Sequence, residues 1–86
     1  MRVYSLTVII MIKGTMTPTE IGTTIRTARK SQGLRQDELA GAAGVGLRFI
    51  VDLEAGKPTA QLGKALQVLH ALGCAVAITP PKAPKL

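Results

Sequence analysis

The 86-residue sequence predicts one small, mainly α-helical domain, and three observations support this fold class. Hydrophobic residues make up 47% of the chain but aromatic residues only 2%, so the core must be aliphatic. From Thr17 onward, capping residues and glycines divide the chain into short segments with helical periodicity. The net charge of +6 favours a polyanionic partner, and nucleic acid is the first such partner to expect.

The first sixteen residues differ from the rest of the chain, because Val3 to Ile12 form an almost unbroken apolar, β-branched run. The run is too short for a transmembrane helix, which needs about 20 apolar residues. The residues after it lack the cleavage pattern of a secretory signal. Its Val, Ile and Thr residues favour a β-strand. Three interpretations of residues 1–16 stay open: a genuine strand, an extension produced by an early start codon ahead of Met11 or Met16, or, less favoured, a signal peptide.

Four helices are expected after this segment. The first begins at a capping box, in which the Thr17 hydroxyl accepts from the backbone of Glu20 and Pro18 takes the first helical position. It ends at Gly33. The other three are each followed by a glycine: Gln36–Ala43 before Gly44, Leu47–Ala55 before Gly56, and a helix from after Thr59 to before Gly73.

The last helix carries an apolar stripe expected to face the core, composed of Leu62, Ala65, Leu66, Leu69 and Leu72. Cys74–Thr79 is predicted to be a short strand. The Pro- and Lys-rich residues 80–86 have nothing to bury and are predicted to be a disordered tail.

A tight turn joins the second and third helices. Gly44 supplies a positive φ, and the small side chain of Ala40 lets the helices cross steeply. Apolar residues with inward-pointing spacing fill the angle between the helices: Leu39, Ala43, Val45, Ile50 and Leu53. This spacing is typical of the helix-turn-helix of DNA-binding proteins, whose second helix enters the major groove.

A family resemblance is carried by the segment RTARKSQGLRQDELAGAAGVGLRFIVDLEAGKPTAQLGKALQVLHALG. It resembles the Xre or lambda-repressor-like helix-turn-helix family, whose pattern includes Q-x-E-L-A, a Gly-Val turn and I-x-x-[IL]-E-x-G. The second half and the strand after it are similar to HipB-type antitoxins, small repressors that pair with a kinase toxin. The resemblance implies a four- to five-helix lambda-repressor-like DNA-binding domain over residues 17–79, with a short C-terminal β-strand.

The resemblance also implies which side chains meet DNA. Gln36 would lie beside a backbone phosphate, and Arg48 would bond guanine O6 and N7, with phosphate binding as the alternative. Asp52 would orient Arg48. The full expected set is Arg35, Gln36, Gly46, Leu47, Arg48, Phe49, Asp52 and Lys57.

The sequence departs from the family pattern at two of these positions. Arg35 replaces the usual Thr or Ser before the second helix, and Leu47 replaces a Gln that could read a base edge. Phe49 is expected either to touch a thymine methyl group or to pack against the first helix. Basic residues around the interface are expected to position the DNA: Arg26, Arg29, Lys30, Arg35 and Lys57. The resemblance implies that Glu54 is structural, as a partner of Arg29.

The single cysteine, Cys74, and single histidine, His70, leave too few ligands for a structural zinc site. We expect no metal, no cofactor and no enzyme activity. The C-terminal strand was expected to lack a partner in its own chain and to pair with its two-fold mate in a homodimer. The residues of this dimerisation strand are Ala75, Val76, Ala77, Ile78 and Thr79.

These expectations define a function: a cytoplasmic repressor that binds a palindromic double-stranded operator and does not associate with membranes. The HipB-type resemblance implies the antitoxin of a type II toxin–antitoxin system, which autoregulates its operon and has a HipA-like kinase toxin as its partner. Two alternatives stay open. One is a stand-alone Xre-type regulator, and the other is a protein-interaction module that does not bind DNA.

Overall fold

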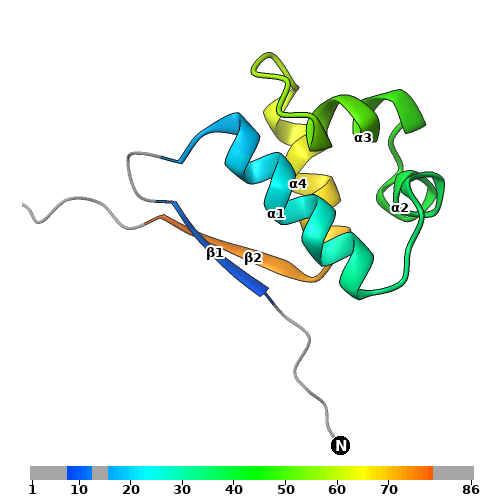
Figure 1. Cartoon of the computed structure of the whole chain (residues 1–86), viewed down its shortest axis with the longest axis horizontal. Helices are drawn as coiled ribbons and strands as arrows, with labels where there is room; N and C mark the ends of the chain where they lie inside the picture. The colour runs from blue at the N-terminus through cyan, green and yellow to red at the C-terminus, as the bar shows by residue number, and fades with distance from the viewer. Residues whose placement is uncertain (1–7, 13–15, 79–86) are drawn as a thin grey trace, which may run out of the picture.

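The computed structural model describes the backbone of residues 8–12 and 16–78 and the side chains of residues 16–78. Its elements in chain order are β1 (Val8–Ile12), α1 (Pro18–Ser31), α2 (Gln36–Ala43), α3 (Leu47–Glu54), α4 (Leu62–Ala71) and β2 (Cys74–Ile78). Figure 1 shows α1 crossing in front of α4, with α2 and α3 on one side of this pair and the two strands on the other. The mainly helical fold with a short C-terminal strand is confirmed.

The two strands pair with each other in a parallel sheet, with Val8 opposite Cys74 and Ile12 opposite Ile78. All four described helices form the crossover between them, as a parallel pairing requires a long connection. The expectation that β2 lacks a partner in its own chain is therefore wrong. The pairing with β1 uses one edge of β2, so dimerisation through the strand stays a prediction.

Several expectations fall outside the described residues. Residues 1–7 and 13–15 belong to the N-terminal segment with several open interpretations, and β1 lies inside the apolar part of that segment. Thr79 of the expected dimerisation strand and the expected tail over residues 80–86 also lie outside them.

The capping box at the start of α1 is present. The Glu20 N–H donates to Thr17 Oγ1 over 3.1 Å, and the Thr17 N–H donates to Glu20 Oε1 over 2.8 Å. Two otherwise unsatisfied donors of the first turn are thereby bonded, which defines where α1 begins.

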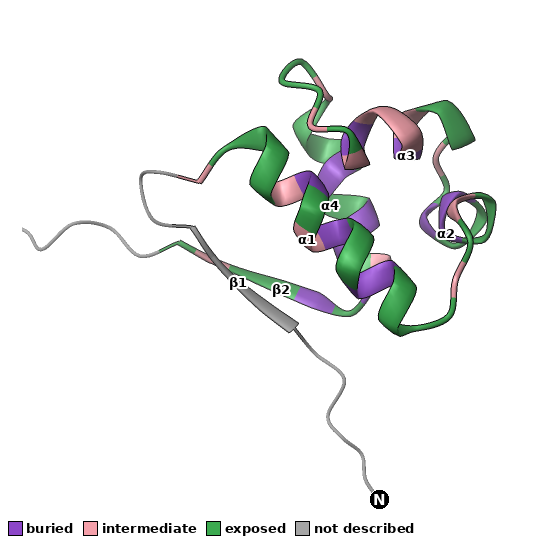
Figure 2. Ribbon diagram, in the orientation of Figure 1, coloured by how far each residue is buried: buried purple, intermediate pink, exposed green. Residues whose placement is uncertain are grey.

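The turn between α2 and α3 has the expected geometry. Gly44 ends α2 with a φ of 73°, and the Val45 N–H then bonds the Ala40 carbonyl over 3.0 Å. Leu39 and Ile50, one from each helix, are fully buried in the angle. Figure 2 shows the buried residues of all four helices facing one shared interior. The remaining apolar residues predicted to fill the angle are buried or half-buried: Ala43, Val45 and Leu53.

The predicted apolar stripe of α4 is partly wrong. Leu62 is 73% exposed and Leu66 is 46% exposed, whereas Val68, which the stripe omitted, is fully buried. The helix carries two overlapping apolar stripes at helical spacing, and packing against α1 and α2 buries the one that contains Val68. Leu62 and Leu66 are left on the outer side.

Gly22 of α1 provides a test of how closely α1 and α3 approach. A Cβ at this position would collide with the Leu53 carbonyl oxygen and lie 2.7 Å from that of Glu54. Backbone atoms cannot yield without displacing α3, so Gly22→Ala should lower the free energy of unfolding by about 1–3 kcal/mol in urea denaturation.

Gly41, on the exposed side of α2, is the matched control, because a Cβ there would meet nothing within 4 Å. Gly41→Ala should raise the free energy of unfolding by about 0.5–1 kcal/mol, since alanine is the better helix former. Equal effects of the two substitutions would contradict the close approach of α1 and α3.

Candidate nucleic-acid interface

A buried ion pair holds the helices that carry the candidate site. Arg29 of α1 donates from Nε to Glu54 Oε2 over 2.6 Å and from Nη2 to Glu54 Oε1 over 3.0 Å. The two side chains are only 9% and 4% exposed. The hydrogen bonds to Glu54 raise the pKa of Arg29 above its ordinary value, although burial opposes this shift. The pair joins α1 to the end of α3.

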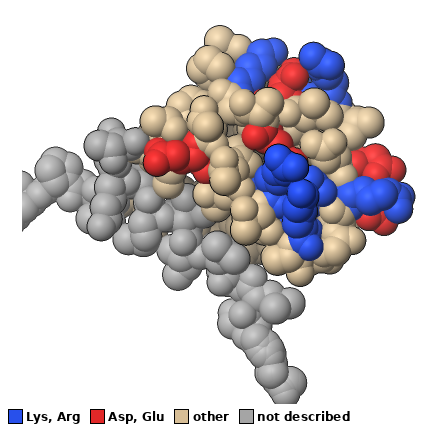
Figure 3. All heavy atoms as spheres, in the orientation of Figure 1, with Lys and Arg blue, Asp and Glu red and all other residues tan. Residues whose placement is uncertain are grey.

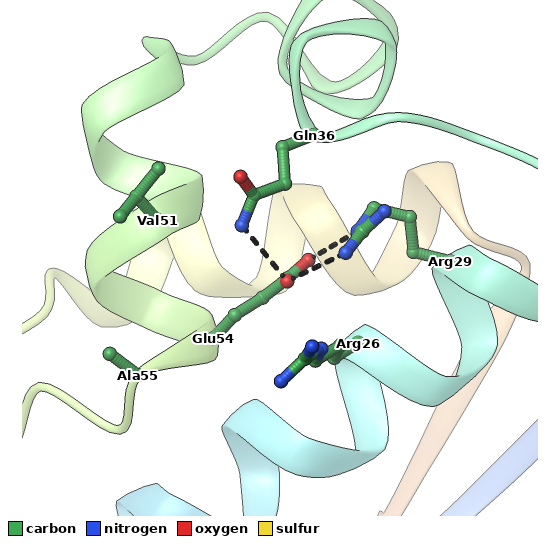
Figure 4. Close-up of a pocket in the computed structure, with 6 residues that line it drawn as sticks. All are labelled: Arg26, Arg29, Gln36, Val51, Glu54 and Ala55. Atoms are coloured by element: carbon green, nitrogen blue, oxygen red, sulfur yellow. Dashed lines mark hydrogen bonds and ion pairs between the residues drawn. The ribbon is translucent and has the colours of Figure 1, made fainter.

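The same carboxylate also holds α2. Gln36, the first residue of α2, donates from Nε2 to Glu54 Oε1 over 3.1 Å, so three helices meet at one side chain. Figure 4 shows Gln36, Arg29 and Glu54 converging in this way, with Arg26 beside them. The structural role expected for Glu54 is confirmed, and the expectation that Arg29 contacts DNA as a positioning charge is wrong because Arg29 is buried.

A polar hollow of about 350 Å³ opens above this network, lined in part by Arg26 and Gln36. The Gln36 amide nitrogen carries a second hydrogen, so Gln36 keeps one side-chain donor beyond its bond to Glu54. Arg26 is exposed, and no ion pair of Arg26 is found among the described side chains. The hollow thus combines an available cation with a hydrogen-bond donor.

The first turn of α3 presents two of the expected contact residues to solvent. Leu47 is 49% exposed, and the Arg48 side chain is 85% exposed. Gly46 precedes them as the N-cap and makes no side-chain cap. Arg48 and Lys57 both pair with Asp52, at 3.2 Å from Nε and 3.7 Å from Nζ. Asp52 therefore lies where it can orient Arg48.

Phe49 lies at the edge of the core and lines a hollow together with two other expected contacts, Asp52 and Lys57. Its side chain is half-buried, and the Lys64 Nζ lies 5.9 Å from the ring centroid. The hollow lies beside the loop between α3 and α4. Sequence reasoning missed Lys64, because the helical spacing of α4 does not show that this side chain lies over Phe49 of α3.

Arg35 is fully committed to neighbouring acids. Its Nε donates to Asp37 Oδ1 over 3.0 Å, and its Nη1 lies 3.7 Å from Glu38 Oε2. The hydrogen bond from Arg35 lowers the pKa of Asp37 below its ordinary value. The Arg35 side chain has no hydrogen-bond acceptor, so it cannot cap α2 as a Thr or Ser hydroxyl would. The Glu38 carboxylate nevertheless accepts from the Arg35 backbone N–H over 2.8 Å, which is one of the two hydrogen bonds of a capping box.

The described basic residues share the surface with acidic ones. On the face that Figure 3 shows, Lys and Arg side chains are interspersed with Asp and Glu. Sequence reasoning expected Asp52 beside Arg48 but did not assign Lys57 to Asp52 or Arg35 to Asp37 and Glu38.

Nothing in the described part of the chain indicates a metal centre, since no group of three His, Cys, Asp or Glu side chains gathers there. Cys74 is buried, and burial raises the pKa of its thiol, which disfavours the thiolate that metals bind. None of the described helices has the length and apolar content to cross a membrane.

Comparison with known proteins agrees with this geometry. Residues 25–78 match the family described as helix-turn-helix. A protein of Sinorhizobium fredii (strain NBRC 101917 / NGR234), named "Uncharacterized HTH-type transcriptional regulator y4mF", is 68% identical over 71 residues, which cover 83% of this chain and 93% of the relative. The chain belongs to the helix-turn-helix family.

Two solved structures share the fold. They are described as "HipB-O4 20mer complex" and "Structure of HipA-HipB-O2-O3 complex". Each superposes with a TM-score of 0.72 at 21% sequence identity, over 83% of this chain and 100% of the solved one.

The Arg29–Glu54 pair is tested by removing its acid. Glu54→Ala should lower the free energy of unfolding by about 3–5 kcal/mol in urea denaturation, because a buried guanidinium loses its partner. Asp52→Ala is the control, since its partners Arg48 and Lys57 are exposed, and it should cost at most about 1 kcal/mol. A smaller loss for Glu54→Ala than for Asp52→Ala would contradict the role of the buried pair.

Proposed function

We propose that the protein is a sequence-specific DNA-binding transcriptional repressor. The observation that carries this proposal is the exposed first turn of α3, where Leu47 and Arg48 project beyond a rigid helix-turn-helix. A helix presented in this way fits the major groove, and its N-terminal residues meet base edges. The name of the relative from Sinorhizobium fredii, a transcriptional regulator, supports the same function.

The proposed contacts divide into base readers and phosphate contacts. Arg48 reads guanine after leaving Asp52, and Leu47 contacts a thymine methyl group. The phosphate contacts flank α3, with Gln36 and Arg35 on the α2 side and Lys57 after the helix. Gly46 allows the backbone to approach the DNA closely. Phe49 supports this surface from its edge, since Lys64 and the α3–α4 loop cover part of its ring.

We further propose that the repressor is a HipB-type antitoxin with a HipA-like kinase as its partner. The fold shared with HipB supports this proposal, and so does the solved complex that contains both HipA and HipB. The alternative to the antitoxin is a stand-alone transcriptional regulator without a toxin partner. A kinase-like protein encoded by the adjacent gene would favour the antitoxin, and its absence would favour the stand-alone regulator.

The proposed operator is palindromic and is bound by a homodimer. Two α3 helices related by a two-fold axis would meet half-sites about 34–36 Å apart on one face of the DNA. Among the described residues β2 pairs only with β1, and strand pairing across the axis would use the other edge of Ala75–Ile78.

DNA binding is tested by its salt dependence. The logarithm of the affinity for duplex DNA should fall linearly with the logarithm of salt concentration, because phosphate contacts release counterions. Fluorescence anisotropy over a salt series measures the slope. A flat salt response, or no binding at low ionic strength, would instead favour the protein-interaction module.

Base reading by Arg48 is tested by comparing two DNAs. Arg48→Ala should weaken operator binding by about 1–3 kcal/mol and random-sequence binding much less, since a base contact acts only on the correct sequence. Lys57→Ala, which removes the other cation paired with Asp52, should weaken both DNAs alike. Equal losses for Arg48→Ala on both DNAs would show that Arg48 binds phosphate.

A further inference from the structure

One exposed apolar side chain of α3 lies apart from the other exposed apolar surface. Five large hydrophobic residues are exposed in the described part of the chain, and four of them line a groove between α4 and β2: Leu62, Leu66, Val76 and Ile78. The fifth is Leu47, which is 49% exposed. It is the first residue of α3, the helix proposed to enter the major groove.

Two further apolar residues continue from Leu47 along the same side of α3. Val51 and Ala55 follow it at spacings of four residues, which places the three side chains in one row. Val51 is half-buried and Ala55 is exposed. Neither belongs to the core or to the half-buried residues packed against it, and both line the polar hollow, where Figure 4 shows them one turn apart. We call Leu47, Val51 and Ala55 the α3 stripe.

Folding alone does not account for the α3 stripe. The side of a surface helix that faces solvent is ordinarily polar, and the core of this domain is built from the opposite side of α3, with Ile50 and Leu53. Single exposed hydrophobic residues are common, but a contiguous row of them marks a surface that contacts a ligand.

The charges beside the α3 stripe indicate what kind of ligand covers it. Arg48 borders the stripe on one side, and its side chain is 85% exposed. Arg26 and Gln36 lie on the other side, across the hollow. Asp52 also borders the stripe, but its carboxylate is paired with Arg48 and Lys57. An apolar centre between cationic flanks complements the major groove, which has anionic phosphates along both rims and base edges on its floor.

Within that groove, one kind of group suits the stripe. The side chains of leucine, valine and alanine have neither a donor nor an acceptor, so they cannot bond the polar edges of the bases. The apolar group that DNA presents in the major groove is the methyl group at C5 of thymine. Methylation of cytosine at C5 places the same group at the same position of the pyrimidine ring. Thymine and 5-methylcytosine therefore offer the stripe a shared chemistry.

We propose that the α3 stripe recognises the 5-methyl groups of pyrimidines, so that cytosine methylation within the operator strengthens binding. This inference rests on the proposed function and adds the chemical group that α3 recognises. Residues four apart on a helix are separated by about 6 Å along its axis, which is close to two base-pair steps of about 3.4 Å each. Leu47 and Val51 thus contact methyl groups on pyrimidines about two steps apart.

The experiment removes and adds single methyl groups on the DNA. A duplex is selected from a randomised pool with the full chain, and its thymines are replaced one at a time by uracil, which keeps every hydrogen-bonding group. At one or two positions this change should lower the affinity measured by fluorescence anisotropy about fourfold, the effect of exposing one methyl group to water. With a C·G pair at such a position, methylation of the cytosine at C5 should raise the affinity by about the same factor.

Protein variants assign this effect to the α3 stripe. Leu47→Ala should bind the thymine and uracil duplexes equally at the position that Leu47 contacts, because the shortened side chain no longer reaches the methyl group. Leu62→Ala is the matched control, since Leu62 is also exposed, at 73%, and is also the first residue of its helix, but it lies on α4. It should keep the wild-type ratio of the two affinities.

The outcomes separate this inference from the proposed function. If the chain selects a duplex but uracil changes its affinity nowhere, or if Leu47→Ala discriminates as wild type does, DNA binding stands and methyl recognition by the stripe is wrong. If thymine methyl groups contribute but methylated cytosine binds no better than cytosine, the effect of cytosine methylation is wrong. If the chain selects no duplex at low ionic strength, the proposed function and the inference both fail, and the stripe belongs to a protein-binding surface.

Discussion

The buried pair of Arg29 and Glu54 is the interaction on which the rest of the structure depends. Its two side chains are more than nine-tenths buried, and Gln36 adds a hydrogen bond to the same carboxylate. A desolvated pair is stable only when nearly every donor and acceptor is satisfied. The Arg29 Nη1 is accordingly bonded to the Leu34 carbonyl over 2.8 Å. These bonds join α1, α2 and α3 at one carboxylate, so the pair helps to set the position of α3.

The cations of the candidate DNA surface are paired with acids that an anionic ligand would have to replace. Arg48 and Lys57 share Asp52, and Arg35 is held by Asp37 and Glu38. Exposed pairs of this kind contribute little to stability, so under the proposed function DNA phosphates and bases would replace the acids at small cost. The acids would hold the cations in position before binding and lessen attraction to anions that do not fit. Both effects would favour discrimination between DNA sequences.

The molecule separates its polar and apolar surfaces. The candidate DNA surface lies on α2 and α3, with charged side chains around it, while an apolar groove lined by Leu62, Leu66, Val76 and Ile78 lies between α4 and β2. α4 connects the two, because its inner stripe packs into the shared core and its outer positions line the groove.

The sequence by itself determined the local features of this protein. The capping box at Thr17, the left-handed turn at Gly44 and the apolar spacing of α2 and α3 all follow from interactions between near neighbours in the chain. The strand pairing and the exposed side of α4 could not be predicted in this way. β1 and β2 are separated by the whole helical part of the chain, and α4 carries two possible stripes. Only tertiary packing decides which strand edge and which helix face are covered, because those choices depend on contacts between residues far apart in the sequence.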